Sequence, residues 1–252
     1  MSLHAPPERR ARERILLMGS WNAGKTYNAL KLAEKLQSSG SGAQMYVIDT
    51  DFAMDRMLDG EFGHLENVTH TVADEWPAYT AALDSYNNKM TDQDWLVIDM
   101  IGPAWDLVQE YFVDMVFGGG MDEFFLKARV ANTKGSPLDG FKDWTVINKL
   151  YRKSTLKLVG CKGHVLCTSQ VEPVNYDKDD KQIRNTFGNL GVKPKGQKHT
   201  AHLFHTILLL AARKNDDWRV TTAKDRGRKH LIDVQLRDFP TQYLIARAGW
   251  KP

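Results

Sequence analysis

Cysteine is scarce in this sequence. The 252 residues contain two, Cys161 and Cys167, which are too few for a disulfide framework or for a zinc site built from cysteines alone. We therefore expect both to be buried, reduced thiols, as is usual in the cytoplasm.

Long apolar runs are missing as well. The longest, at about 203–212, is too short to cross a bilayer, and the polar, basic start of the chain lacks the apolar stretch of a signal peptide. These features predict a cytoplasmic protein that does not contact membranes.

A strong charge of either sign is also absent. The net charge is +3, so composition alone does not indicate a nucleic-acid partner. The apolar fraction of 42 % suits an ordinary globular core, and the length suits one large domain. We expect residues 1–13 to be a flexible basic arm, either a solvated tail or a contact for phosphates or acidic partners, and residues 14–252 to be a single core.

One motif carries clear chemistry, the phosphate-binding pattern G-x-x-x-x-G-K-[ST]. It is formed by Gly19, Ser20, Trp21, Asn22, Ala23, Gly24, Lys25 and Thr26. The two glycines let the backbone curl around a phosphate, Lys25 is expected at the β- and γ-phosphates, and the Thr26 hydroxyl at Mg²⁺. An apolar strand at 15–18 and a helical pattern at 25–36 supply the required context. The motif predicts ATP and Mg²⁺ as ligands, while the role of Trp21, stacking or merely covering the loop, stays open.

The rest of the chain alternates in the same way. Apolar strands are expected at 45–48, 95–98 and 164–168, helices at 74–90, 103–130 and 144–158, and further strands at 206–212, 218–222 and 232–236. The helical stretch 103–130 is interrupted by three glycines, which predicts two pieces. This order predicts an α/β fold with a twisted, mostly parallel sheet flanked by helices.

Polar residues end three of these strands. Asp99 follows 95–98, where a carboxylate can hold Mg²⁺ through water. Asp51 follows the second strand and can orient or deprotonate the attacking water, unless it only caps a short helix. Gln170 follows the fourth strand, where its amide can sense the γ-phosphate.

A basic stretch at 171–198 follows Gln170 and shows little periodicity, so we expect a long irregular loop. Its cationic residues are Lys178, Lys181, Arg184, Lys193, Lys195 and Lys198. Such a loop can follow a phosphate backbone, with Tyr176 and Phe187 stacking on bases, although a solvated surface loop is the alternative.

Three histidines, His199, His202 and His205, are spaced by three residues. They fall where a loop is expected to become a strand, so their side chains need not converge. We do not expect a metal site there.

The order of these motifs resembles the RecA family over about 14–236. The segment 47–55, VIDTDFAMD, is similar to the stretch that carries the family's catalytic glutamate, with Asp51 in its place. LVID, ending at Asp99, resembles the Walker B strand, and CTSQ, ending at Gln170, resembles the strand before the second DNA-binding loop. The strand VTTAKDR resembles the one whose basic residues, here Lys224 and Arg226, reach the ATP of a neighbouring subunit.

This resemblance implies a RecA-like P-loop ATPase core, closest to the short annealing ATPases and recombinases of bacteriophages, and hence the host cytoplasm. It implies a DNA-stimulated ATPase that binds single-stranded DNA, self-associates into a filament or ring with ATP between subunits, and has a single-strand-binding protein as a further partner. A hexameric helicase-like motor and a nucleotide-dependent switch without DNA contact remain alternatives.

Overall fold

The computed structural model of the chain describes residues 12–131, 142–213, 217–227, 230–236 and 240–245. Its centre is one large sheet with strand order β10-β9-β8-β1-β5-β4-β2-β3. The strands are β1 (Arg14–Gly19), β2 (Met45–Asp49), β3 (Val68–Val72), β4 (Trp95–Asp99), β5 (His164–Ser169), β8 (Thr206–Arg213), β9 (Asp217–Asp225) and β10 (Val234–Leu236). Neighbours from β3 to β8 run parallel, whereas β9 and β10 are antiparallel additions at one end. The predicted fold class, an α/β fold with a mostly parallel sheet flanked by helices, is confirmed.

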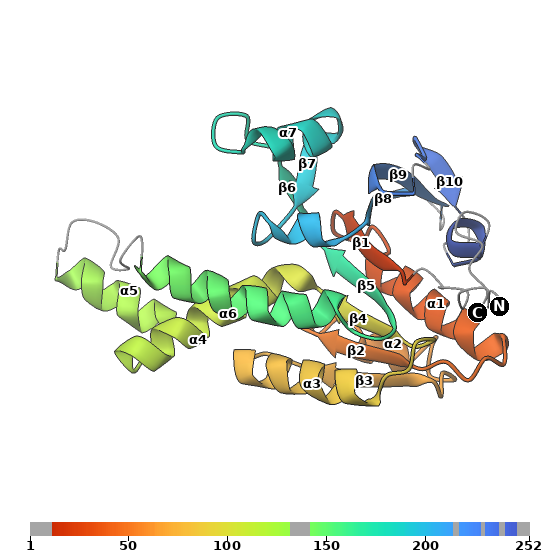
Figure 1. Cartoon of the computed structure of the whole chain (residues 1–252), viewed down its shortest axis with the longest axis horizontal. Helices are drawn as coiled ribbons and strands as arrows, with labels where there is room; N and C mark the ends of the chain where they lie inside the picture. The colour runs from red at the N-terminus through yellow and green to blue at the C-terminus, as the bar shows by residue number, and fades with distance from the viewer. Residues whose placement is uncertain (1–11, 132–141, 214–216, 228–229, 237–239, 246–252) are drawn as a thin grey trace, which may run out of the picture.

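Helices cover both faces of this sheet (Figure 1). They are α1 (Lys25–Ser38), α2 (Asp55–Leu58), α3 (Trp76–Lys89), α4 (Ile101–Phe117), α5 (Met121–Val130), α6 (Lys142–Val159) and α7 (Lys181–Phe187). As predicted, a glycine separates α4 from α5: Gly118 ends α4 in the left-handed conformation. In Figure 1, α5 extends beyond the sheet, together with the C-terminal end of α4 and the N-terminal end of α6.

Alternate strand residues divide the core into two layers. Ile15 and Leu17 of β1 pack with α1, whereas Leu16 and Met18 pack with the cluster that includes α3, α4 and α6. All six residues of β1 are buried, as are all of β2, β4 and β5. Strands buried on both faces are continuous apolar runs, which is why the sequence pattern located them.

The start of the fold lies within the expected N-terminal arm. Residues 1–11, including Arg9 and Arg10, lie outside the described part of the chain. Glu13 and Arg14 are buried, and the Arg14 guanidinium donates to backbone carbonyls of Val159, Gly163 and Cys161. Arg14 is therefore a structural residue rather than a contact for phosphates.

The basic stretch 171–198 is not the irregular loop that we expected. It folds into β6 (Val171–Pro173), α7, the 3-10 turn η1 (Gly188–Leu190) and β7 (Val192–Pro194), with β6 and β7 paired antiparallel. Asp180 caps α7 by accepting a hydrogen bond from the amide of Ile183. We call residues 171–198 the basic unit; it stands away from the main sheet at the top of Figure 1.

Strand β3 and the π-helix η3 (Pro240–Ile245) were also not expected from the sequence. Strand β3 is partly exposed at the edge of the sheet and lacks a long apolar run. The π-helix η3 places Tyr243 and Leu244 in the core layer beside α1.

Other expectations concern the cysteines and the membrane. Cys161 and Cys167 are both buried and free, as predicted. Within the described residues, no helix combines the length and apolar character that crossing a membrane requires.

Candidate nucleotide-binding site

The phosphate-binding loop lies between the end of β1 and the start of α1. Asn22 and Gly24 adopt positive φ values of 56° and 80°, which curl the backbone into a cradle. The Lys25 ammonium is buried over this cradle and donates to the carbonyls of Gly19 (3.1 Å) and Ser20 (2.9 Å). Burial lowers the pKa of Lys25, because it makes the charged ammonium less stable. An anionic ligand in place of these carbonyls would stabilise the ammonium more strongly.

The loop rests against β9. Trp218 is nearly buried there, and its ring stacks on that of Tyr27 with centroids 5.2 Å apart. A Cβ atom on Gly24 would lie 2.1 Å from the indole nitrogen of Trp218. The loop thus depends on a residue that the motif itself does not contain.

Asp99 lies at the end of β4 beside the same loop. Its side chain is fully buried, and its Oδ1 accepts a hydrogen bond from the hydroxyl of Thr168 on β5. Burial raises the pKa of Asp99, while Thr168 and the nearby Thr26 hydroxyl lower it.

The oxygens beside Asp99 fit a magnesium ion. Its Oδ2 is buried and has no hydrogen-bond partner of its own among the described residues. A buried carboxylate oxygen without a donor is costly, and Mg²⁺ prefers oxygen ligands. Asp99 and Thr26 are therefore the residues that would hold the ion.

Asp51 lies on the turn after β2 and lines the same cleft as the phosphate-binding loop. Although the residue is exposed at the cleft, partial burial of its carboxyl group and the nearby charge of Asp99 raise its pKa to about 7. Asp49 behaves differently: burial alone would raise its pKa, but hydrogen bonds from His70 and the amides of Met54 and Asp51 hold it at about 2. Two acids two residues apart are thus tuned in opposite directions, which is common at active sites.

The strand ends bring these residues together. Because these strands are parallel neighbours, their carboxyl ends lie at the same edge of the sheet. This edge carries the phosphate-binding loop after β1, Asp49 of β2, Asp99 of β4 and Ser169 of β5. At this edge, the phosphate-binding loop borders a cleft of about 590 Å³. Its lining residues are Trp21, Asn22, Ala23, Gly24, Lys25, Thr26, Tyr27, Asp51, Ala53, Met57, Met100, Gln170 and Trp218.

This geometry agrees with the comparison to known families. A family model described as an AAA domain matches residues 11–235. The chain belongs to this family of P-loop ATPases. No curated protein matches the sequence. Family membership shows nucleotide binding and, in general, hydrolysis; Mg²⁺, the usual companion of such a site, is supported by the geometry above.

Gln170 lies between the cleft and the basic unit. Gln170 lines the cleft, and its backbone carbonyl accepts a hydrogen bond from the backbone amide of Lys195 (2.8 Å). The Ser169 hydroxyl donates to the carbonyls of Gln170 and Lys195. The residue at the cleft and the end of β7 are therefore directly joined.

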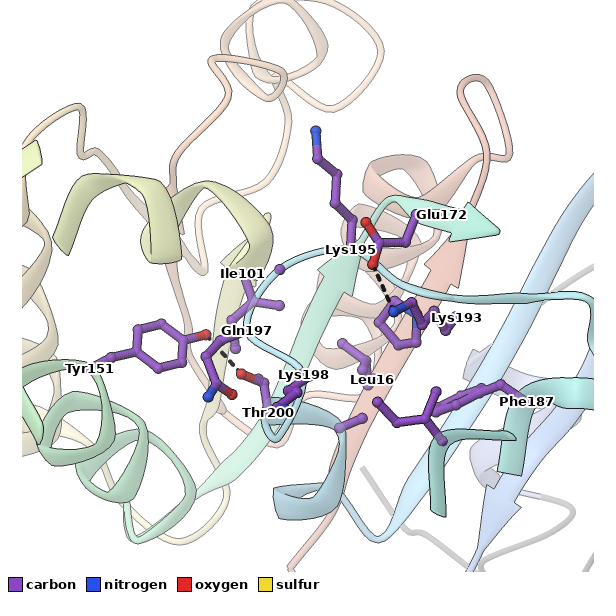
Figure 2. A pocket seen from close by; sticks show the side chains of 14 residues that line it. Leu16, Ile101, Tyr151, Glu172, Phe187, Lys193, Lys195, Gln197, Lys198 and Thr200 are labelled. Atoms are coloured by element: carbon purple, nitrogen blue, oxygen red, sulfur yellow. Dashed lines mark hydrogen bonds and ion pairs between the residues drawn. The ribbon is translucent and has the colours of Figure 1, made fainter. Parts of the chain in front are cut away.

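The basic unit exposes most of its predicted DNA contacts. Lys178, Lys181, Arg184, Lys195 and Lys198 are exposed. Lys193 is different, because it is largely buried and paired with Glu172 (3.2 Å) and with Asp179. Figure 2 shows the Lys193–Glu172 ion pair at one end of a small pocket under the unit, while Lys195 points away from the pocket. Lys193 thus holds the unit together and is poorly placed to contact phosphates.

The two aromatic residues of the basic unit also separate. Tyr176 is 58 % exposed and can stack on a base. Phe187 is buried, and Figure 2 shows it directed toward Leu16 beneath the unit. The expectation that Phe187 stacks on bases is therefore wrong.

Lys224 and Arg226 lie at the end of β9 away from Trp218. The Lys224 ammonium is half-buried and donates to the carbonyls of Ala201 and His202, at 3.3 and 3.2 Å. Arg226 is exposed. Neither residue lines the cleft of its own chain.

The histidines do not converge. His199 and His202 stack on each other, with ring centroids 6.0 Å apart, whereas His205 accepts a hydrogen bond from the amide of Arg14. Among the described residues, no group of three His, Cys, Asp or Glu side chains is suited to hold a metal ion.

Sequence reasoning missed Trp218, Thr168 and His70. Thr168 immediately precedes Ser169 and Gln170 in the sequence, so its strand position gave a usable signal. Trp218 and His70 act through contacts between distant segments, and the sequence gives no signal for such contacts.

Proposed function

We propose that this AAA domain is an ATP-dependent, single-stranded-DNA-binding protein of the RecA type. It assembles into filaments or rings with ATP between neighbouring copies and promotes annealing or strand exchange. The observation that carries the proposal is the direct link from the cleft to the basic unit through Gln170 and Lys195 (2.8 Å). A residue that senses the γ-phosphate would move the same backbone that anchors the cationic surface.

Within the cleft, each residue has a distinct task in hydrolysis. Asp99 and Thr26 would hold Mg²⁺, which would neutralise the charge that develops on the phosphate groups. Lys25 supplies positive charge at the phosphates. Asp51 accepts a proton from the attacking water or orients it, a task suited to a carboxyl group whose pKa is about 7.

The second half of the site is proposed to come from a neighbouring copy. Lys224 and Arg226 do not line the cleft of their own chain, and Arg226 is exposed. Trp21, in the phosphate-binding loop, is 80 % exposed. Phe52, on the turn after β2, is 58 % exposed. Exposed aromatic side chains beside a binding cleft suit burial by a partner subunit.

The test compares ATP turnover with and without single-stranded DNA and images the assemblies formed. The key variant carries Lys178→Ala, Lys181→Ala and Lys198→Ala. Its matched control removes three exposed lysines outside the basic unit, by Lys89→Ala, Lys149→Ala and Lys162→Ala. For three lost phosphate contacts, the slope of log K against log salt should fall by about 2 in the key variant.

The outcomes discriminate between the functions considered. Stimulation by DNA and assembly on DNA, both weakened in the key variant and retained in the control, support the proposal. Turnover that DNA does not change, with no assembly on it, would overturn the proposal and favour a nucleotide-dependent switch. Closed hexamers that unwind duplexes without annealing strands would favour a helicase-like motor.

A further inference from the structure

The turn after β2 is built around one carboxylate. Asp49 is fully buried, and its Oδ1 accepts the amide hydrogen of Asp51 (3.1 Å). Its Oδ2 accepts the amide hydrogen of Met54 (3.0 Å) and lies 3.2 Å from Nε2 of His70. Three hydrogen bonds to one carboxylate hold the backbone that carries Asp51.

His70 joins this carboxylate to a second one. It lies on the edge strand β3, and its Nδ1 is 3.3 Å from Oδ1 of Asp55, at the start of α2. The side chain is only 15 % exposed. The imidazole therefore bridges the two ends of the turn, Asp49 before it and Asp55 after it.

The turn itself is strained and needs such support. Phe52, at its apex, has a φ of 59°, a conformation that is costly for a bulky residue. On the other side, the Thr50 hydroxyl donates to the carbonyl of Met100 (2.6 Å), which ties the turn to the end of β4. The turn thus has one tether toward β4 and another, through His70, toward β3 and α2.

We propose that His70 is a positioning residue for ATP hydrolysis, which holds the Asp49–Asp55 turn so that Asp51 faces the attacking water. The proposal rests on the catalytic role of Asp51 given above, and it does not depend on DNA binding. Since His70 does not line the nucleotide cleft, it acts through the turn and not on the nucleotide.

The experiment measures kcat, KM and the affinity for a fluorescent ATP analogue in His70→Ala, His70→Gln and Asp51→Asn. Small displacements of a reacting group cost up to about 100-fold in rate, so we expect kcat of His70→Ala to fall about 10-fold or more. KM and analogue affinity should change less than about 2-fold, because the loss concerns the chemical step. His70→Gln retains an amide donor toward Asp49 and should recover part of kcat. His64→Ala, at an exposed histidine paired with Glu34, is the matched control.

A double variant distinguishes positioning from a general structural role. Adding His70→Ala to Asp51→Asn should cause no further loss of single-turnover rate, because the group that His70 positions is already disabled. A further loss equal to that in the wild-type background would overturn the proposal, as would a parallel loss of analogue affinity. Full turnover in His70→Ala would also overturn it. If His70→Ala does not fold, His70→Gln is judged by the same criteria.

The controls also separate this inference from the function on which it rests. Normal turnover in Asp51→Asn would refute the catalytic role of Asp51 and the inference with it. A failure of DNA to stimulate ATP turnover would refute the DNA-binding function and leave the role of His70 intact.

Discussion

The indole nitrogen of Trp218 lies 2.1 Å from the position that a Cβ atom on Gly24 would take. Strand β9 therefore packs directly against the phosphate-binding loop, and Tyr27 stacks on the same indole from the first turn of α1. Gly24 also has a φ of 80°. This glycine is required for two separate reasons, backbone conformation and contact with Trp218.

A first prediction separates these two reasons. Gly42 has a φ of 72° but nothing within 4 Å of its would-be Cβ, so Gly42→Ala should cost about 1 kcal/mol of unfolding free energy through backbone strain alone. Gly24→Ala should cost more and should abolish nucleotide binding, because the new methyl group displaces either the loop or Trp218. Denaturant unfolding and titration with a fluorescent ATP analogue measure the two effects. Equal stability and unchanged nucleotide affinity in the two variants would show that the contact with Trp218 is unimportant.

A second prediction concerns the dependence of turnover on pH. The proposed general base, Asp51, must be ionised to act, and its pKa is raised to about 7. The value of kcat/KM, which reports on the free enzyme, should therefore fall as the pH drops below about 7. In Asp51→Asn, kcat/KM should be much lower, and the acidic limb should move to lower pH.

The comparison of wild type with Asp51→Asn also tests whether another carboxylate of the site causes the acidic limb. Asp99 also has a raised pKa, and its protonation would weaken Mg²⁺ binding. An acidic limb that stays near pH 7 in Asp51→Asn would assign the titration to a group other than Asp51.

A third prediction tests Arg14, the first residue of β1. The buried guanidinium donates to the carbonyls of Val159 (2.7 Å), Gly163 (2.7 Å) and Cys161 (2.9 Å). Arg14→Met should remove the guanidinium's hydrogen bonds to these three carbonyls and lower the free energy of unfolding by at least about 2 kcal/mol. Arg152→Met, at an exposed position of α6, should change stability by less than about 0.5 kcal/mol. A similar small change for Arg14→Met, measured by denaturant unfolding, would contradict a structural role.

The sequence predicted those parts of the fold that depend on local pattern. The continuous apolar runs of β1, β2, β4 and β5 and the phosphate-loop motif located the sheet edge and the positions of Lys25, Asp99 and Gln170. Strand β3 was missed because an edge strand exposes one side and has no such run. The basic unit was taken for a loop because its order comes from tertiary contacts, such as those of Lys193, and not from periodicity.

The same limit applied within the site. Asp51 was identified from its place after β2, but the contact of His70 with Asp49, at the start of the same turn, joins residues 21 positions apart in sequence. Trp218 is almost 200 residues from Gly24. Contacts of this kind leave no trace in local spacing, so only the folded structure reveals them.

A fourth prediction concerns the two basic residues at the end of β9. Lys224 already donates to the carbonyls of Ala201 and His202 in its own chain, whereas Arg226 is exposed. If a neighbouring subunit supplies charge to the cleft, Arg226→Ala should lower turnover by about 1000-fold or more, the contribution of an arginine finger, while nucleotide binding by the monomer survives. Lys224→Ala should also lower stability, because it removes the cation that holds these carbonyls.

Mixing two inactive variants tests whether Arg226 acts on a neighbour. Lys25→Ala cannot engage the phosphates but still presents Arg226, and Arg226→Ala has an intact cleft. In mixed assemblies, an intact cleft can meet an intact Arg226, so the mixture should recover turnover that neither variant shows alone. Recovery should grow with the fraction of Lys25→Ala and then decline as intact clefts become rare. Normal turnover of Arg226→Ala by itself would exclude the role, and a mixture no more active than the sum of its parts would show that Arg226 does not act between subunits.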